Sequence, residues 1–244
     1  MRNIKITVEY DGTNYCGWER QKNGVSIQEM LEKAIEGVTR KKTVIHGSGR
    51  TDAGVHALGQ VATFQTASEI PAEKLLLAIN AHLPRDIVVR KIEEVYGKLH
   101  ARYDARSKVY RYTVLTGPAG SALDRDRVYH VKYPLNVSRM RKAAKCLLGE
   151  HDFRSFTTEA WTRKNTVRTL LDVKIERQGD RIVFTFEGDG FLYNMVRAIV
   201  GTLIDIGRGH LKVEDMKVIL EARDRSKAGP TTPAKGLCLV EVRY

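Results

Sequence analysis

The sequence holds few cysteines and no long apolar run, and each absence excludes a class of protein. Its 244 residues include three cysteines, Cys16, Cys146 and Cys238, which lie far apart and form no Cys-x-x-Cys pair. Neither a disulfide framework nor a zinc site is supported, and a reducing cytoplasm fits best. The N-terminus shows no signal pattern and no apolar run reaches ~18 residues, so neither secretion nor membrane insertion is indicated.

Several catalytic motifs are missing as well. Gly49 and Gly54 have the separation of a phosphate-binding loop, but Val55 and His56 stand where Lys and Ser or Thr are required. No His-x-x-x-His pair or acidic cluster completes a metal site around Asp52 and His56, so we expect no metal. A metal-dependent hydrolase that uses these two residues is kept as a rival.

The chain is strongly basic. Lys and Arg number 41 against 29 Asp and Glu, which gives a formal net charge of +12 and a pI near 9.6. Such an excess favours a polyanionic partner, most often nucleic acid, although a basic protein without such a partner is also compatible with it. The length allows one or two domains with their own cores.

The hydrophobic pattern predicts two similar α+β halves. Alternating and β-branched runs predict strands at residues 4–10, 43–45, 61–64, 87–95, 109–115, 167–175, 181–186 and 237–240. Apolar stripes at helical spacing predict helices at residues 27–38, 71–83, 137–148, 191–206 and 213–221. Ser26 with Glu29 is expected to cap the first helix, and Gly149 the third.

The order strand, helix, strand, strand, helix, strand is the ferredoxin-like layout, and it occurs twice. We therefore expect two lobes, residues 1–105 and 106–244, with the loop at residues 49–56 in the first and a ligand cleft between them. Sheets of this type are common RNA-binding platforms, but the layout also hosts many unrelated functions.

The most informative segment is residues 49–56, Gly-Arg-Thr-Asp-Ala-Gly-Val-His. Its glycines allow sharp turns, and predicted strands on both sides hold the loop that presents Asp52. A carboxylate in such a loop can be a nucleophile, a general base, a metal ligand or a plain turn residue. A neighbouring arginine favours its ionised form, and Arg50 and Arg197 are the candidates.

Arg197 and Tyr110 each have two interpretations. Arg197 lies in an apolar helical run, where a buried charge needs a partner, and Asp52 is the partner we expect. The alternative is that the Arg197 side chain extends from the edge of the core to water. Tyr110 and Tyr112 share one face of a strand, opposite Arg111. Their rings either stack on RNA bases or pair with other rings in the core.

Other segments could contact RNA. Tyr15, Trp18 and Arg20 follow the first strand and could form a contact patch. Basic clusters could bind phosphates, although each by itself is typical of a solvated surface; they are Arg40-Lys41-Lys42, Arg139-Arg141-Lys142 with Lys145, and Arg163-Lys164.

Residues 49–56 resemble the active-site motif of the tRNA pseudouridine(38–40) synthases. The resemblance extends over the whole chain and includes, in the family's order, Glu-Tyr-Asp-Gly at 9–12, Leu-His-Ala-Arg at 99–102, Tyr-Arg-Tyr at 110–112, Asp-Phe and Ser-Phe at 152–156, and Gly-Phe-Leu-Tyr-Asn-Met-Val-Arg at 190–197. Glu19 departs from the glutamine that is usual after Trp18, and Cys238 from a common aromatic.

The resemblance implies a cytoplasmic isomerase that converts uridine to pseudouridine at positions 38, 39 and 40 of the tRNA anticodon stem-loop. It implies a pseudouridine synthase fold, in which two ferredoxin-like lobes join their antiparallel sheets into one larger mixed sheet around a central cleft. It assigns Asp52 as nucleophile, Tyr110 as the ring that stacks on the target base, Arg197 as the partner of Asp52, and Arg50 as the neighbour of the flipped nucleotide. It implies a homodimer without metal or cofactor.

A non-catalytic RNA-binding module on the same platform is the main alternative to an enzyme. It has less support, because neither half shows the glycine- and aromatic-rich signature of RNA recognition motifs.

Overall fold

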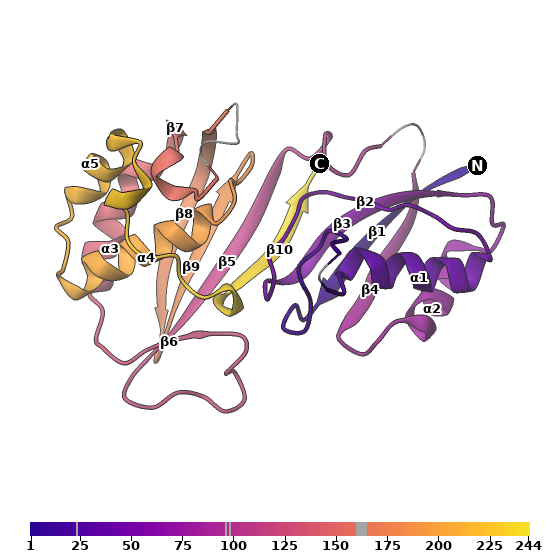
Figure 1. The fold of residues 1–244 in the computed structure, drawn as a ribbon, viewed down its shortest axis with the longest axis horizontal. Helices are drawn as coiled ribbons and strands as arrows, with labels where there is room; N and C mark the ends of the chain where they lie inside the picture. The colour runs from indigo at the N-terminus through magenta and orange to yellow at the C-terminus, as the bar shows by residue number, and fades with distance from the viewer. Residues whose placement is uncertain (23, 96, 98, 160–164) are drawn as a thin grey trace. The chain divides into compact units, whose positions relative to one another are not determined.

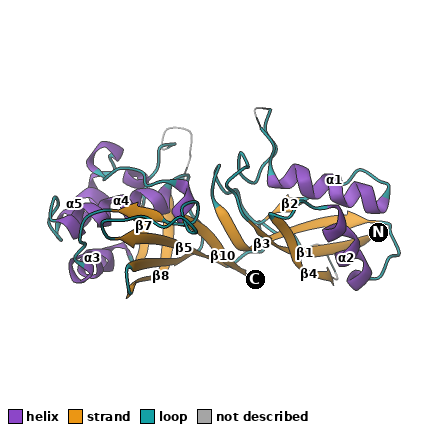
Figure 2. Cartoon of the chain, turned by 90° about the horizontal axis from the view of Figure 1, so that it is seen from below, coloured by secondary structure: helices purple, strands orange, loops and turns teal. Residues whose placement is uncertain are grey.

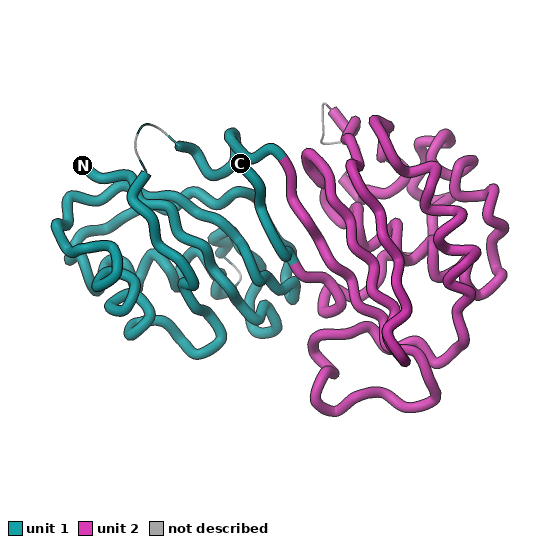
Figure 3. The backbone as a smooth tube through the Cα atoms, turned by 180° about the vertical axis from the view of Figure 1, so that it is seen from behind, with its two compact units in different colours: residues 1–106, 239–244 teal, residues 107–238 magenta. Residues whose placement is uncertain are grey.

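The computed structural model describes residues 1–244 except 23, 96, 98 and 160–164. The chain divides into two compact units, which Figure 3 colours separately. Unit 1 comprises Met1–Arg106 with Leu239–Tyr244, and unit 2 comprises Ser107–Cys238. Each unit is described below by itself.

Unit 1 has the ferredoxin-like arrangement that the sequence predicts. Its β1, β3 and β4 pair antiparallel with β1 in the middle, and β2 adds to β3, which gives the order β4-β1-β3-β2. Figure 1 labels its elements, which are β1 (Arg2–Tyr10), α1 (Ile27–Thr39), β2 (His46–Gly47), β3 (His56–Thr66), α2 (Ala72–His82), β4 (Ile87–Val95) and most of β10 (Leu237–Arg243).

Local sequence signals account for these elements. Ile4 and Ile6 alternate with polar residues along β1 and are fully buried, as are Leu31 and Ile35 on the inner stripe of α1. The Ser26 hydroxyl oxygen accepts the Glu29 N–H at 3.1 Å, which confirms the expected cap of α1.

The strand predicted at residues 43–45 is wrong, because β2 is two residues long and begins at His46. Side chains of α1 replace the strand partner of Ile45: its N–H donates to Glu32 Oε1 at 3.1 Å, and its carbonyl accepts from Gln28 Nε2 at 3.2 Å. The β-branched residues alone could not show that the backbone groups of Ile45 bond to helix side chains.

Unit 2 packs helices against its own strands, of which β5, β9, β8 and β7 pair antiparallel in that order and β6 pairs parallel with β5. Figure 2 shows α3, α4 and α5 grouped beside its strands. The elements are β5 (Ser107–Thr116), β6 (Tyr129–Val131), α3 (Val137–Ala144), β7 (Gly149–Asp152), β8 (Val167–Gln178), β9 (Arg181–Gly188), α4 (Met195–Arg208) and α5 (Asp215–Ala222).

All three helices of unit 2 differ from their predicted bounds. α3 ends at Ala144 and tightens into a 3₁₀ turn, so Gly149 begins a strand and caps no helix. α4 begins at Met195, because Asn194 has left-handed backbone angles (φ 61°) that end the preceding turn. α5 begins at Asp215 and ends at Ala222. The short strands β6 and β7 are not predicted from the sequence.

The α+β class with a large mixed sheet is confirmed, since the described residues form five α-helices and ten strands. The division into lobes 1–105 and 106–244 and the cleft between them stay predictions. Leu239–Tyr244, expected with the second lobe, groups with unit 1. In the described part of the chain, no helix has the length and apolar character needed to cross a membrane.

Candidate active site

The loop that carries Asp52 occupies residues 48–55, between β2 and β3. Asp52 is half-buried, and its carbonyl accepts the Val55 N–H at 3.1 Å, which closes a tight turn. Gly54 has φ +77° in this turn, a conformation that glycine adopts without strain. The hydrogen bond that closes this turn therefore runs through the Asp52 carbonyl, in the backbone.

Gln60 on β3 braces the start of the loop from inside the core. Its side chain is fully buried, and Oε1 accepts from the Ser48 hydroxyl at 2.6 Å and from the Val61 N–H at 3.2 Å. Its Nε2 donates to the Gly49 carbonyl at 3.0 Å. A buried amide that satisfies a donor and an acceptor of the same loop fixes that loop in one position.

The middle of the loop is held from the opposite side by the end of β1 and the segment after it. The Tyr10 and Thr51 hydroxyls lie 2.8 Å apart and are buried, and the Trp18 N–H donates to the Thr51 carbonyl at 3.0 Å. Gly12 allows a close backbone approach, because a Cβ there would collide with the Val55 carbonyl. The loop is therefore held on both sides of Asp52.

His56 is part of this framework. Its ring is buried, and Nδ1 accepts the Gly12 N–H at 3.1 Å and lies 3.2 Å from Asp11 Oδ1. The described residues contain no group of three or more His, Cys, Asp or Glu that could hold a metal. The rival metal site around Asp52 and His56 therefore gains no support from the geometry.

Arg50 extends outward from the same loop. Its Nε lies 2.6 Å from Glu19 Oε2, and the two side chains are 62% and 44% exposed. Glu19 is also one of the two residues that depart from the family pattern. Exposed ion pairs of this kind contribute little to stability, so the pair can open at little cost.

The contact patch predicted at Tyr15, Trp18 and Arg20 is not found. Tyr15 and Trp18 are buried, at 9% and 3% exposure, and the Tyr15 hydroxyl donates to Asp86 Oδ1 at 2.6 Å. Burial and this carboxylate raise the pKa of Tyr15. The guanidinium of Arg20 binds Glu32 on α1. The basic pair at residues 163–164 lies outside the described residues.

Tyr110 lies in unit 2, on β5. It is 8% exposed and meets Phe191 edge to face, with ring centroids 5.0 Å apart and planes at 77°. Tyr112, on the same face, is fully buried and donates its hydroxyl to the Pro233 carbonyl at 2.7 Å. Burial raises the pKa of Tyr112. Both tyrosines are therefore buried, and the contact with Phe191 fixes the orientation of the Tyr110 ring. The stacking of Tyr110 on a base stays a prediction.

Arg197 lies in the first turns of α4 and is held within unit 2. Its Nε donates to the Thr232 carbonyl at 2.7 Å, and its Nη1 donates to Asn194 Oδ1 at 2.7 Å. The Asn194 amide also donates to the Thr158 hydroxyl at 3.1 Å. Thr232 and Asn194 are orienting residues that the sequence reasoning missed. The left-handed Asn194, three residues before the arginine, gave no pattern to detect.

The structure brings Asp52 and Arg50 together on one loop of unit 1, and it places Tyr110 and Arg197 on β5 and α4 of unit 2. The pairing of Arg197 with Asp52 stays a prediction.

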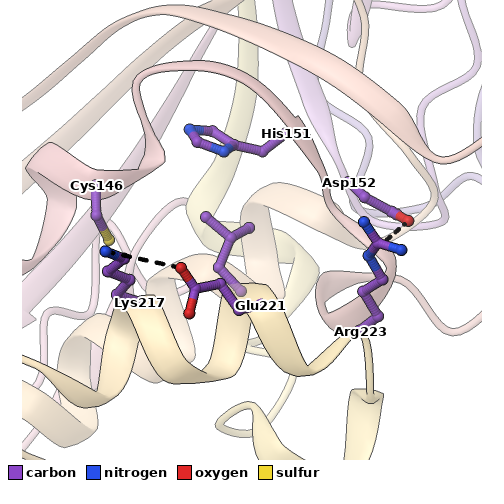
Figure 4. A pocket seen from close by; sticks show the side chains of 7 residues that line it. Cys146, His151, Asp152, Lys217, Glu221 and Arg223 are labelled. Atoms are coloured by element: carbon purple, nitrogen blue, oxygen red, sulfur yellow. Dashed lines mark ion pairs between the residues drawn. The ribbon is translucent and has the colours of Figure 1, made fainter.

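Figure 4 shows a pocket of about 330 Å³ in unit 2, separate from these four residues. Its charges are already paired, with Arg223 3.3 Å from Asp152 and Lys217 3.8 Å from Glu221. Burial raises the pKa of the Cys146 thiol in its wall, which keeps the thiol in its less reactive form. The remaining residues that line the pocket are His151 and Leu220.

Comparison with known proteins identifies the class. A family model described as "tRNA pseudouridine synthase" matches residues 6–104 and 143–244. The chain is 49% identical over 244 residues to tRNA pseudouridine synthase A of Acetivibrio thermocellus, with all of both chains covered. It is also 49% identical to tRNA pseudouridine synthase A 2 of Clostridium perfringens, again over the full length of both.

The chain belongs to the tRNA pseudouridine synthase family, which is a family of isomerases. The solved "Crystal Structure of a Cbf5-Nop10-Gar1 Complex" matches 97% of this chain and 48% of its own with 12% identity and a TM-score of 0.42, a likeness too distant to add to the assignment.

Proposed function

We propose that this protein isomerises uridine to pseudouridine at positions 38, 39 and 40 of the tRNA anticodon stem-loop, with Asp52 as the nucleophile. The observation that carries the proposal is the loop at residues 48–55, which hydrogen bonds from Gln60, Tyr10 and the Trp18 backbone hold in place around Asp52. Preorganised loops on rigid strands are typical of catalytic sites. The relatives named above support tRNA as the substrate.

The reaction needs no oxidant or added group. The N1–C1′ bond of uridine breaks, a C5–C1′ bond forms, C5 loses a proton and N1 gains one. Asp52 would form a transient bond to C6 of the base or C1′ of the sugar, which splits the exchange into two easier steps. The target base must first leave the helix, which costs a few kcal/mol. Tyr110 would offset part of that cost by stacking.

Arg50 and Arg197 complete the proposed site as substrate-binding residues. Arg50 is exposed and suited to contact a phosphate next to the flipped nucleotide. Arg197 is oriented by Asn194 and Thr232, as a residue must be if it is to fix a charge in one place. We further propose a homodimer that acts in the cytoplasm and requires neither metal nor organic cofactor.

Product mapping tests this function. The protein is incubated with tRNA transcripts that carry one anticodon-stem uridine at position 38, 39 or 40, and pseudouridine is located by carbodiimide adducts that stop primer extension. We expect one new stop at each of the three positions and none in a transcript with cytidine at all three. A stop at another tRNA position, or none at all, contradicts the proposal.

Tyr110 supplies a second test. Tyr110→Phe keeps the ring and its contact with Phe191, so it should retain most of the activity. Tyr110→Ala removes a stacking surface worth about 1–3 kcal/mol per base and should lower kcat/KM by on the order of tenfold or more. Exposed Tyr133→Ala is the control. Equal losses in the two Tyr110 variants, with melting temperatures unchanged, would show that stacking is not the main role of this residue.

A further inference from the structure

Three aromatic rings form a continuous stack on unit 1, and none of them belongs to the Asp52 loop. The His46 and His100 centroids lie 5.5 Å apart, and the His100 and Tyr103 centroids lie 4.3 Å apart, with planes tilted by 32° and 34°. His46 begins β2, and the other two rings lie in the segment after β4. His100 is the second residue of the Leu-His-Ala-Arg motif at 99–102, which lies outside the Asp52 loop.

The outer ring of this stack is exposed. Tyr103 is 77% exposed, whereas the neighbouring Ala101 is fully buried. The Tyr244 hydroxyl donates to the Ala101 carbonyl at 2.7 Å, and Asn3 Nδ2 donates to the Leu99 carbonyl at 3.3 Å. The segment is therefore fixed to the sheet beneath it, and the exposure of Tyr103 does not result from a loose loop.

Hydrogen bonds also hold the middle ring in place. His100 Nδ1 accepts the N–H of Arg102 at 3.1 Å and faces that of Tyr103 at 3.4 Å. The backbone N–H of His100 donates to Asp104 Oδ2 at 2.7 Å, which fixes the chain at the base of the ring. A surface that is ordered before binding loses little entropy when a partner stacks on it.

The charges around the outer ring favour an anionic partner. Arg102 and Arg106 are exposed, and they flank Tyr103 in the sequence. The one carboxylate between them, that of Asp104, is already hydrogen-bonded to His100. Exposed rings beside arginines bind nucleic acid by stacking on bases while the guanidinium groups contact phosphates.

We propose that His46, His100 and Tyr103 form a base-stacking platform on which an unpaired nucleobase of the substrate RNA rests, in addition to the base that is modified. This inference depends on the proposed function only for the identity of the RNA. In this proposal Tyr103 is a binding residue, so its removal lowers the affinity for tRNA and leaves the rate of the chemical step unchanged.

The test compares binding of a full-length tRNA transcript to Tyr103→Ala, Tyr103→Phe and wild-type protein by fluorescence anisotropy. We expect Tyr103→Ala to raise Kd about tenfold, Tyr103→Phe to match wild type, and kcat at saturating tRNA to be unchanged in both. The matched control is Tyr133→Ala, which removes an exposed tyrosine of unit 2. An unchanged Kd in Tyr103→Ala, or an equal rise in the control, overturns the proposal.

A spectroscopic arm identifies the stacking itself. Tyr103→Trp places an indole on the platform, and its added fluorescence over wild type should be quenched when tRNA binds, whereas that of Tyr133→Trp should not. Absence of this quenching would contradict stacking of RNA on Tyr103. A change in the oligomeric state of RNA-free Tyr103→Ala in sedimentation would show that the surface contacts another copy of the protein, and it would also overturn the proposal.

Failure of this inference is distinguishable from failure of the proposed function. Product mapping with wild-type protein does not depend on the platform. The anisotropy and quenching experiments measure binding alone, so they can be interpreted even if the protein forms no product.

Discussion

Asp52→Asn is expected to abolish pseudouridine formation while tRNA binding stays near the wild-type value. The amide has the shape of the carboxylate but cannot form the transient bond, so single-turnover rates should fall by on the order of 10⁴-fold or more, as when other covalent nucleophiles are removed. The turn itself should survive, because it uses the Asp52 carbonyl and because asparagine suits turns. Rates are measured by tritium release from C5 of labelled tRNA.

The control for Asp52→Asn is Asp126→Asn, which neutralises a carboxylate of unit 2 whose side chain is 45% exposed and lies 3.2 Å from Arg125. It should turn over at the wild-type rate. Turnover that persists in Asp52→Asn would show that Asp52 is not the nucleophile and would favour a loop without a catalytic role. A loss of turnover after exhaustive chelation of the wild-type protein would instead revive the rival metal site.

The elements most predictable from sequence are those whose signal is local. The β4 prediction at residues 87–95 agrees with the structure residue for residue, because the segment follows a proline that ends the preceding helix and is rich in β-branched residues. The start of α1 follows from its Ser26 cap. The strand predicted at residues 43–45 was wrong for a tertiary reason, because Glu32 and Gln28 of α1 bind the backbone of Ile45.

The candidate site was predictable in part for a related reason. Asp52 stands out through the glycines and strands around it, and those constraints are local. The contact patch at Tyr15 and Trp18 was wrong because aromatic residues in a loop resemble a binding surface until their burial is known. The residues that orient Arg197, namely Asn194 and Thr232, are contributed by a left-handed turn and by a segment 35 residues away.

Gln60→Glu is the substitution that should most affect the framework of the Asp52 loop. The introduced carboxyl would place an oxygen against the Gly49 carbonyl, where Nε2 now donates, in a position with no exposure to water. An ionised carboxylate there is unpaired, and buried unpaired charges cost about 3–5 kcal/mol. The variant should therefore lose about that much free energy of unfolding at pH 8, and the loop should lose its fixed position.

The pH dependence gives the sign of this effect. Burial raises the pKa of the introduced carboxyl in the folded state above its unfolded value of about 4.3. Its protonated form can donate to Gly49, so the variant is most stable below the unfolded pKa and loses stability as pH rises through the folded one. Urea unfolding at pH 5 and pH 8 measures the difference, with exposed Gln65→Glu on the same strand as the control. A deficit of equal size at both pH values would mean that the carboxyl escapes to water, and that Gln60 does not hold the Asp52 loop in the way its hydrogen bonds indicate.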